Sequence, residues 1–267
     1  MTTKTVLVGL TPRTDSLDTV TWAAEYAGRL SVPLRILLAG TANVGADVAA
    51  RTVQNATGAV RDRFPHLSLS TVIAEDDLAD VLLERCGDAH LVVVAGDPGR
   101  AGVAATVAGR APCPVAAVSP GATWDADGRP VLVGADGTEH SEQALRWAFA
   151  EADRLGVGVR VAHCQPHGPA SAVTARRRNS VFDLVALFTG RYPAIPVQLH
   201  TVSCAPAETL AWHSQFASMV VVGHRAHSLG GRTYRRLLRD AACPVVIAGP
   251  DTRLDTVVTK TGAAAFG

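Results

Sequence analysis

The sequence predicts an α/β protein of two tandem doubly wound domains, each a five-stranded parallel sheet flanked by helices. Three features predict this fold: an ordered internal repeat, short apolar runs of Val, Leu and Ile, and segments of helical period between those runs. Runs without polar alternation are typical of strands that are buried on both faces. Strands that alternate with helices pair in parallel through right-handed crossovers, so each copy is expected to form one such sheet.

The repeat is visible at both ends of each copy. Each copy opens on a strand-like segment, continues into a helix that contains Trp-Ala, and closes on Cys-Pro-Val. The matching segments are Val6–Leu10 with Val131–Ala135, Trp22–Ala23 with Trp147–Ala148, and Ala111–Val115 with Ala241–Val245. Because these matches occur in the same order, the sequence indicates a tandem duplication.

The repeat divides the chain into a first domain at residues 1–120, a linker at 121–130, a second domain at 131–250 and a tail at 251–267. The linker is rich in Pro and Gly, which interrupt helices and strands. The tail has no clear pattern and is expected to be a mobile extension.

Each copy is expected to contribute five strands. Those of the first copy are Thr5–Gly9, Leu34–Leu38, Leu67–Ile73, Leu91–Val94 and Val115–Val118. Those of the second copy are Val131–Gly134, Val159–His163, Val197–Val202, Met219–Val222 and Val245–Ala248. Ser141 is expected to start a helix whose apolar residues fall on one face, and a longer helix is expected over Ala170–Arg191.

Composition favours a globular protein that binds neither nucleic acid nor membranes. Lys and Arg number 25 against 24 Asp and Glu, so the basic excess of a polyanion-binding surface is missing, and Arg176–Arg178 is expected to be a solvated helix face. Apolar runs are much shorter than the roughly 20 residues of a membrane helix, and no signal-like segment opens the chain, so a cytoplasmic location is expected. The five cysteines are widely spaced, which predicts reduced thiols that act as small apolar side chains.

The second copy carries a set of motifs in a characteristic order. It reads Gly134-Ala135-Asp136-Gly137-Thr138, then Ala144-Leu145-Arg146-Trp147-Ala148, then Val222-Gly223, and finally Cys243-Pro244-Val245. With the first copy, this order resembles the universal stress protein family in its tandem form, over residues 4–250. The resemblance implies the fold of the adenine nucleotide α-hydrolases and a role in the stress response.

The resemblance also implies a place for a ligand. In the nucleotide-binding members of the family, ATP lies at the C-terminal ends of the strands, where open α/β sheets bind their ligands. The Asp after the first strand contacts the nucleoside, and a Gly-x2-Gly-x9-Gly-Ser/Thr loop that enters a helix holds the phosphates. Such a loop works because Gly lets backbone N–H groups approach closely and a helix N-terminus favours negative charge.

The first copy departs from this pattern. Thr11 stands where the second copy has Asp136. The spacing Gly96-x2-Gly99-x9-Gly109 matches the loop motif, but counting back from Cys-Pro-Val places Gly109 at the end of the following helix. We therefore expect no nucleotide site in the first copy.

The second copy keeps Asp136 but alters the loop. Ala226 replaces the second Gly of the motif, and the segment between Gly223 and Gly231 is shorter than the family loop. Histidine and arginine side chains in this segment could contact a phosphate. An adenine nucleotide such as ATP is therefore expected here or nowhere in the chain. The candidate binding residues are Ala135, Asp136, Gly223, His224, Arg225, Gly231 and Arg232.

Three functions stay open on these residues. The first is a non-enzymatic stress-response protein whose second domain retains weak adenine-nucleotide binding. The second is a slow nucleotide hydrolase at the same site, which the shortened loop disfavours. The third is an interaction or structural module whose two pockets have both degenerated.

Other side-chain patterns predict no catalytic or metal site. Ser141 and His140 lie too close in one turn to form a nucleophile–base–orienter line. Pairs of histidines recur, but no Cys or carboxylate cluster completes a set of four zinc ligands. The pairs are His163 with His167, His200 with His213, and His224 with His227.

The duplication also predicts an assembly. Universal stress proteins pair through the last, edge strand of the sheet, so the resemblance implies that Val115–Val118 and Val245–Ala248 pair within one chain as an internal pseudo-dimer. Unpaired, these strands would expose a row of N–H and C=O groups. A further homodimer and a protein partner stay open.

Overall fold

The computed structural model of the chain describes residues 4–12, 17–96, 101–122, 128–165, 171–202, 205–224 and 232–249. We call residues 4–122 the first half and residues 128–249 the second half. The first half contains β1 (Thr5–Leu10), α1 (Leu17–Leu30), β2 (Leu34–Leu38), α2 (Ala46–Arg63), β3 (Leu69–Ile73), α3 (Leu78–Arg85), β4 (Ala89–Ala95), α4 (Ala101–Ala108) and β5 (Val115–Val118). The second half contains β6 (Val131–Gly134), α5 (Glu139–Leu155), β7 (Val159–Cys164), α6 (Ala172–Arg191), β8 (Val197–Val202), α7 (Pro206–Ser214), β9 (Met219–Gly223), α8 (Arg232–Asp240) and β10 (Val245–Ala248).

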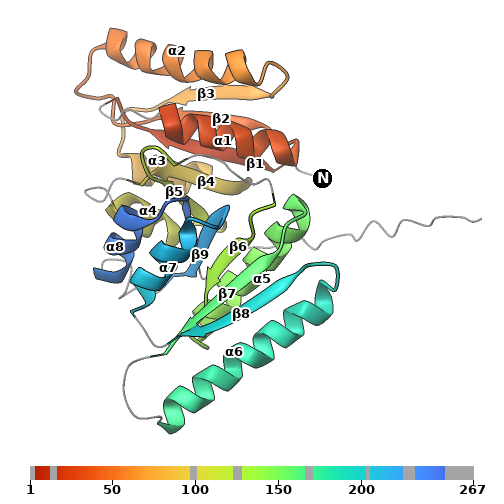
Figure 1. Cartoon of the computed structure of the whole chain (residues 1–267). Helices are drawn as coiled ribbons and strands as arrows, with labels where there is room; N and C mark the ends of the chain where they lie inside the picture. The colour runs from red at the N-terminus through yellow and green to blue at the C-terminus, as the bar shows by residue number, and fades with distance from the viewer. Residues whose placement is uncertain are drawn as a thin grey trace, which may run out of the picture.

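The ten strands form one continuous sheet in the order β3-β2-β1-β4-β5-β10-β9-β6-β7-β8. All neighbours are parallel except β5 and β10, which pair antiparallel where the halves meet. The two longest helices, α2 and α6, lie at opposite ends of the molecule beside the edge strands β3 and β8 (Figure 1). The predicted fold class and the predicted pairing of the two closing strands are thus confirmed.

The strands lie where the apolar runs predict them, because these residues are buried by helices on both faces of the sheet. β1, β5 and β10 are buried at every residue, and most residues of β2, β4, β6, β7 and β9 are buried as well. The largest differences are at β4, which spans Ala89–Ala95 instead of Leu91–Val94, and at β3, which begins at Leu69 instead of Leu67. There the Leu67 N–H donates to the Phe64 carbonyl at 3.0 Å, so this residue belongs to the turn after α2.

Two apolar cores lie on opposite faces of the sheet. The larger contains both tryptophans of the repeat, Trp22 on α1 and Trp147 on α5, each about 1% exposed. The smaller core is built on the other face by α3, α4, α7 and α8. Equivalent positions of the two copies therefore have equivalent packing roles, as expected of a duplication.

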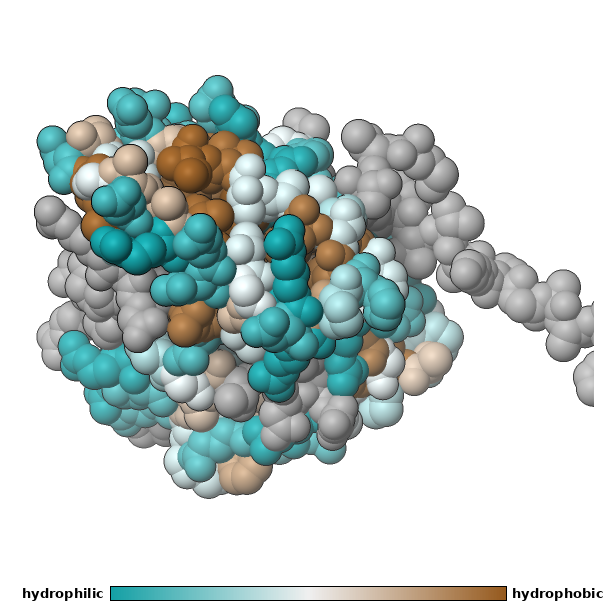
Figure 2. Space-filling model, turned by 90° about the horizontal axis from the view of Figure 1, so that it is seen from above, coloured by the Kyte–Doolittle hydropathy of each residue, from teal (hydrophilic) through white to brown (hydrophobic). Residues whose placement is uncertain are grey.

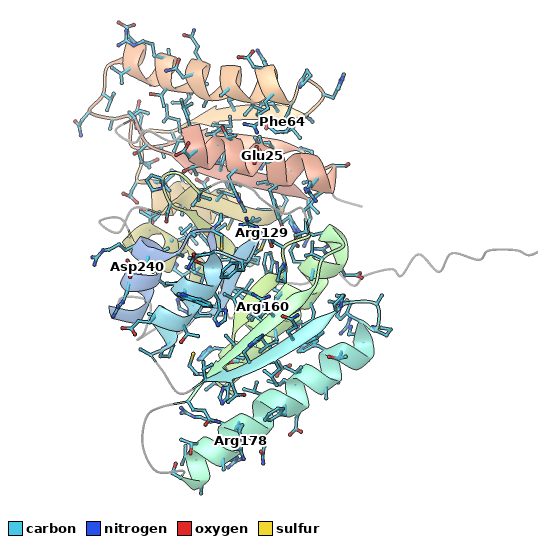
Figure 3. The ribbon with its side chains drawn as sticks, viewed as in Figure 1. Glu25, Phe64, Arg129, Arg160, Arg178 and Asp240 are labelled. Atoms are coloured by element: carbon cyan, nitrogen blue, oxygen red, sulfur yellow. The ribbon has the colours of Figure 1, made fainter. Side chains whose placement is uncertain are left out.

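The surface is mostly polar. Seen from the α2 end, hydrophilic side chains surround smaller apolar areas (Figure 2). Val48 of α2 and Ile73 of β3 are among the exposed apolar residues of the protein. At the other end, Arg176–Arg178 are exposed on α6, and Arg178 is labelled there in Figure 3. No helix within the described segments combines the length and the hydropathy that a membrane crossing requires.

Candidate functional site

A cavity opens at the C-terminal ends of β6, β7 and β9. Its volume is about 240 Å³. It lies where β6 separates β7 from β9 in the strand order, the kind of position at which open α/β sheets bind ligands. Ala135, Asp136 and Gly223 contribute to its wall, so the structure brings these three predicted site residues together. The full lining is Gly134, Ala135, Asp136, Thr138, His140, Ser141, Ala162, Cys164, Pro206, Leu210, Val222 and Gly223.

Asp136 is held in a fixed orientation by the turn between β6 and α5. Its Oδ1 accepts hydrogen bonds from the Thr138 N–H at 3.1 Å, from Thr138 Oγ1 at 2.6 Å and from Ser141 Oγ at 2.6 Å. Ser141 Oγ in turn accepts from the Asp136 N–H at 2.8 Å. Three donors on one carboxylate oxygen stabilise its ionised form and hold it at the cavity wall.

Ser141 therefore has a different role from the predicted one. The helix α5 begins at Glu139, with Thr138 at the N-cap position, and Ser141 lies inside the first turn. Its hydroxyl donates to the Asp136 carboxylate, so the described contacts do not form a line of serine, histidine and carboxylate. His140 lies beside Glu139, with Nε2 3.8 Å from Oε1.

His163 on β7 is a site residue that the sequence did not reveal as such. Its side chain is buried, and its ring lies 2.9 Å from the Ala135 carbonyl through Nδ1. Because a carbonyl only accepts, Nδ1 carries the hydrogen and donates it, which fixes the tautomer. The sequence feature that could have indicated this role is the position of His163 near the end of a predicted strand, because ligand sites lie at strand ends. The next residue, Cys164, lines the cavity.

The turn at Asp136 is also held by α6. Ser180 Oγ donates to the Gly137 carbonyl at 3.2 Å. Gly137 has a φ of 77°, and a Cβ there would overlap the Arg177 carbonyl oxygen. Asp136 therefore lies between Ala135, whose carbonyl accepts from His163, and Gly137, which packs against α6.

Gly223 ends β9 against the first turn of α5. The resemblance implied a phosphate-binding role for this glycine, and the structure shows a packing reason for it: a Cβ would overlap the His140 carbonyl oxygen. Gly223→Ala is expected to lower the free energy of unfolding by about 1–3 kcal/mol, because neither backbone segment can move without disturbing a buried strand. Urea unfolding followed by circular dichroism measures it.

A matched control for that variant is Gly58→Ala. Gly58 lies in the middle of α2, and a Cβ there meets nothing within 4 Å. Alanine is the better helix former by about 0.5–1 kcal/mol, so this variant is expected to be at least as stable as the parent. Equal stability changes in the two variants would contradict the packing role of Gly223.

His224 does not line the described cavity wall, although it was predicted to contact a phosphate. Its N–H donates to the Ala248 carbonyl at 2.9 Å, and its Nε2 would lie 2.9 Å from a Cβ on Gly109 of the first half. Burial and the nearby His140 charge lower its pKa, although a hydrogen bond to the Ala105 backbone opposes them. His224 thus reaches across to the end of α4.

The other predicted phosphate contacts cannot be placed in this cavity. Arg225 and Gly231 lie outside the described residues, as do Ala226 and His227. Arg232 is the first residue of α8, but its side chain is also outside the described part. Their role stays a prediction.

The first half has its own counterpart of this site. Thr11 follows β1, and the methyl groups of Leu78 and Leu82 lie 3.0 Å from the place of a Cβ on Gly9. Gly109 follows the last residue of α4, at the helix end where counting back from Cys-Pro-Val placed it. Gly96 packs against the Ser119 N–H.

The remaining histidine pairs were weighed as metal ligands. The rings of His200 and His213 are 5.7 Å apart, and burial, His200 and Arg160 together lower the pKa of His213. Within the described residues no three His, Cys, Asp or Glu side chains gather as a metal site would require. His167 lies outside these residues.

Comparisons with known proteins agree on a family. A sequence model described as the universal stress protein family matches residues 128–249. A universal stress protein of Mycobacterium tuberculosis is 30% identical over 288 residues, covering 91% of this chain and 96% of the relative. A second, from Mycolicibacterium smegmatis, is 26% identical and covers 92% and 97%.

Solved structures are similar in fold over nearly the same extent. A universal stress protein from Archaeoglobus fulgidus superposes with a TM-score of 0.68 at 13% identity, covering 93% of this chain and 99% of the other. A Pseudomonas aeruginosa structure titled as a member of the same family gives a TM-score of 0.57 at 17% identity, covering 93% and 94%. With the sequence matches and the ten-stranded sheet, these similarities show that the chain belongs to the universal stress protein family.

Proposed function

We propose that the chain is a non-enzymatic stress-response protein whose second half binds an adenine nucleotide in the cavity at Asp136. The observation that carries this proposal is a cavity at the switch in strand order with a carboxylate fixed at its edge. In nucleotide-binding members of the family, the equivalent Asp contacts the nucleoside. A partner protein would then bind the nucleotide-bound and nucleotide-free forms with different affinity, as expected of a regulatory module.

The size of the cavity suits the nucleoside part of the ligand. At about 240 Å³ it is smaller than the roughly 300–1,000 Å³ of sites that enclose whole drug-sized molecules. Leu210 and Val222 offer apolar walls for a base, while Asp136 and Thr138 offer polar groups for a sugar. The phosphates would extend beyond the described walls.

The same contacts disfavour hydrolysis. A hydrolase needs a base positioned on a water molecule or a nucleophile. Ser141 is engaged with Asp136, and Asp136 Oδ1 already accepts three hydrogen bonds. We therefore favour binding without turnover, and the interaction module without a ligand is the second candidate because Thr11 shows that one copy has already lost its acidic residue.

Titration calorimetry with ATP, ADP and adenosine tests the proposal. Asp136→Ala is expected to weaken binding about tenfold or more, since a lost hydrogen bond to a charged group costs about 1.5–3 kcal/mol. Thr11→Ala, at the equivalent position of the first half, is the matched control and should leave the affinity unchanged. Absence of saturable binding by the parent protein at millimolar ATP would favour the interaction module.

Cys164 provides a second, independent readout of the same cavity. It is partly exposed and lines the cavity wall, whereas Cys86, Cys113 and Cys243 are buried, and burial raises the pKa of Cys243 to about 12. In a Cys204→Ser background, bound nucleotide is expected to slow alkylation of Cys164 by a maleimide at least severalfold. If calorimetry shows binding but Cys164 is alkylated equally fast with and without ATP, the nucleotide binds outside this cavity.

A further inference from the structure

The halves meet along β5 and β10, and we call these two strands, with the side chains that contact each other across them, the seam. In the antiparallel pair, Ala116 lies opposite Val246. These residues occupy equivalent positions in the two copies, each following Cys-Pro-Val. A local two-fold axis therefore passes between them, and residues near it face their own equivalents in the other half.

One such pair of equivalents has diverged into complementary groups. Tyr26 on α1 and Glu151 on α5 are separated by the repeat offset of 125 residues, and Tyr26 Oη donates to Glu151 Oε1 at 2.8 Å. Both side chains are completely buried. Identical halves would place the same residue on both sides of the axis, whereas here a hydroxyl meets a carboxylate.

Further polar groups, from both halves, surround that carboxylate. His90 Nε2 on β4 lies 3.3 Å from Glu151 Oε2 and 3.0 Å from Tyr26 Oη. Arg154, one turn after Glu151, donates to Oε2 at 3.4 Å. The equivalent of His90 in the second half is Ser218, which instead donates to the Pro130 carbonyl. The contacts that reach the carboxylate from the other half, those of Tyr26 and His90, therefore exist on one side of the axis only.

The neighbouring residue on α1 shows that the direction of Tyr26 is specific. Glu25, labelled in Figure 3, pairs with Arg63 of α2 at 2.9 Å, away from the seam. The tyrosine one residue later stacks on Trp22 and on the ring of His90. Of these two neighbours on α1, Glu25 pairs with α2 of the same half, whereas Tyr26 contacts the second half.

A second equivalent pair differs at the other face of the seam. Ser119 Oγ donates to the Leu238 carbonyl at 2.9 Å. The equivalent contact joins Gly249 to Ala108, and a Cβ on Gly249 would overlap the Ala108 carbonyl oxygen. The first half therefore needs a glycine opposite α4, and only the second half supplies it.

We propose that the seam accepts only unlike halves, so that two copies of the chain cannot associate through it by pairing first half with first half or second with second. Two second halves would bury Glu151 close to Glu151 with only the Arg154 of each half beside it and without Tyr26 and His90, and burying like charges together is unfavourable. Two first halves would bring Ser119, with its side chain, to the place of Gly249. Each like pairing is thus opposed by a different group.

A double-mutant cycle tests whether the two positions recognise each other. Tyr26→Phe, Glu151→Gln and the double variant are compared in the full chain by urea unfolding. We expect the double variant to be destabilised by less than the sum of the two single variants, because both changes weaken the same Tyr26–Glu151 contact. Additive shifts would overturn the proposal. Tyr26→Phe with Glu142→Gln, which changes a partly exposed carboxylate on the helix of Glu151, is the control pair and should be additive.

Cross-linking tests the pairing itself. Arg29 and Arg154 occupy equivalent positions and line one cavity of about 290 Å³ with Lys4 and His90. In a Cys164→Ser, Cys204→Ser background, chains carrying Arg29→Cys, Arg154→Cys or both are unfolded, refolded at high concentration and treated with a short bismaleimide. Peptide mass spectrometry should find position 29 bridged to 154 only in the double variant. Bridges from 29 to 29 or from 154 to 154 would overturn the proposal.

Discussion

Replacing Gly137 with alanine is expected to lower the free energy of unfolding by about 3 kcal/mol and to abolish nucleotide binding. Two costs add at this position. A φ of 77° is left-handed backbone, which costs an L-residue about 1–2 kcal/mol. A Cβ would also overlap the Arg177 carbonyl oxygen, and such overpacking costs typically 1–3 kcal/mol. Because Gly137 follows Asp136, any relief of the overlap moves the carboxylate at the cavity edge.

Gly40→Ala separates the two costs. Gly40 has a similar φ of 74°, but a Cβ there meets nothing within 4 Å. This variant is expected to lose only the backbone part, about 1–2 kcal/mol, and to keep the affinity for nucleotide. Urea unfolding and calorimetry on both variants check this. If Gly137→Ala bound ATP as the parent does, the turn would not position the ligand.

Removing the buried carboxylate at the seam is the other change with a large expected effect. Glu151→Ala leaves the Tyr26 hydroxyl, His90 and Arg154 without their shared partner. Breaking a buried charged pair in this way costs typically about 3–5 kcal/mol. Thermal or urea unfolding at pH 7 measures the loss, and Glu142→Ala, whose carboxylate is partly exposed beside Arg146, should lose well under half as much.

The same carboxylate predicts a loss of stability in acid. Burial raises the pKa of Glu151, but the hydrogen bond and charge of His90, with Arg154 and Tyr26, outweigh burial and hold the pKa below its usual range. The unfolded chain has the higher pKa, about 4.3, so the contribution is complete above that pH and is lost as the pH falls through the folded value. Glu151→Gln should therefore flatten the dependence of the unfolding free energy on pH below about 4.3. An equally steep dependence in this variant would assign the acid sensitivity to other groups.

The fold was predictable because it depends on local patterns. Strands buried on both faces read as unbroken apolar runs, and the bounds of five of them agree with the structure, as for Leu34–Leu38 and Val245–Ala248. The place of the cavity was also predictable, since Asp136 and Gly223 follow strands that end at the same edge. Whether these residues bind nucleotide stays a prediction.

The contacts that sequence reasoning missed depend on tertiary structure. Nothing local in the sequence singles out Glu151 or Tyr26, and the hydrogen bond that joins these buried side chains crosses from one half to the other. His224 looked like a loop cation because nothing local shows that β10 carries it to the first half. His163 looked like half of a histidine pair, whereas its partner is a backbone carbonyl. The spacing of residues along the sequence does not show which groups will be partners in the folded protein.

The antiparallel join of β5 and β10 has a consequence for how the protein responds to its own abundance. A sheet completed by two separate chains comes apart on dilution, because its stability follows the protomer concentration. Here both strands belong to one chain, so the partner is always present at the high local concentration that a linker provides. The ten-stranded sheet should therefore stay intact even when the cell contains only a few copies of the protein.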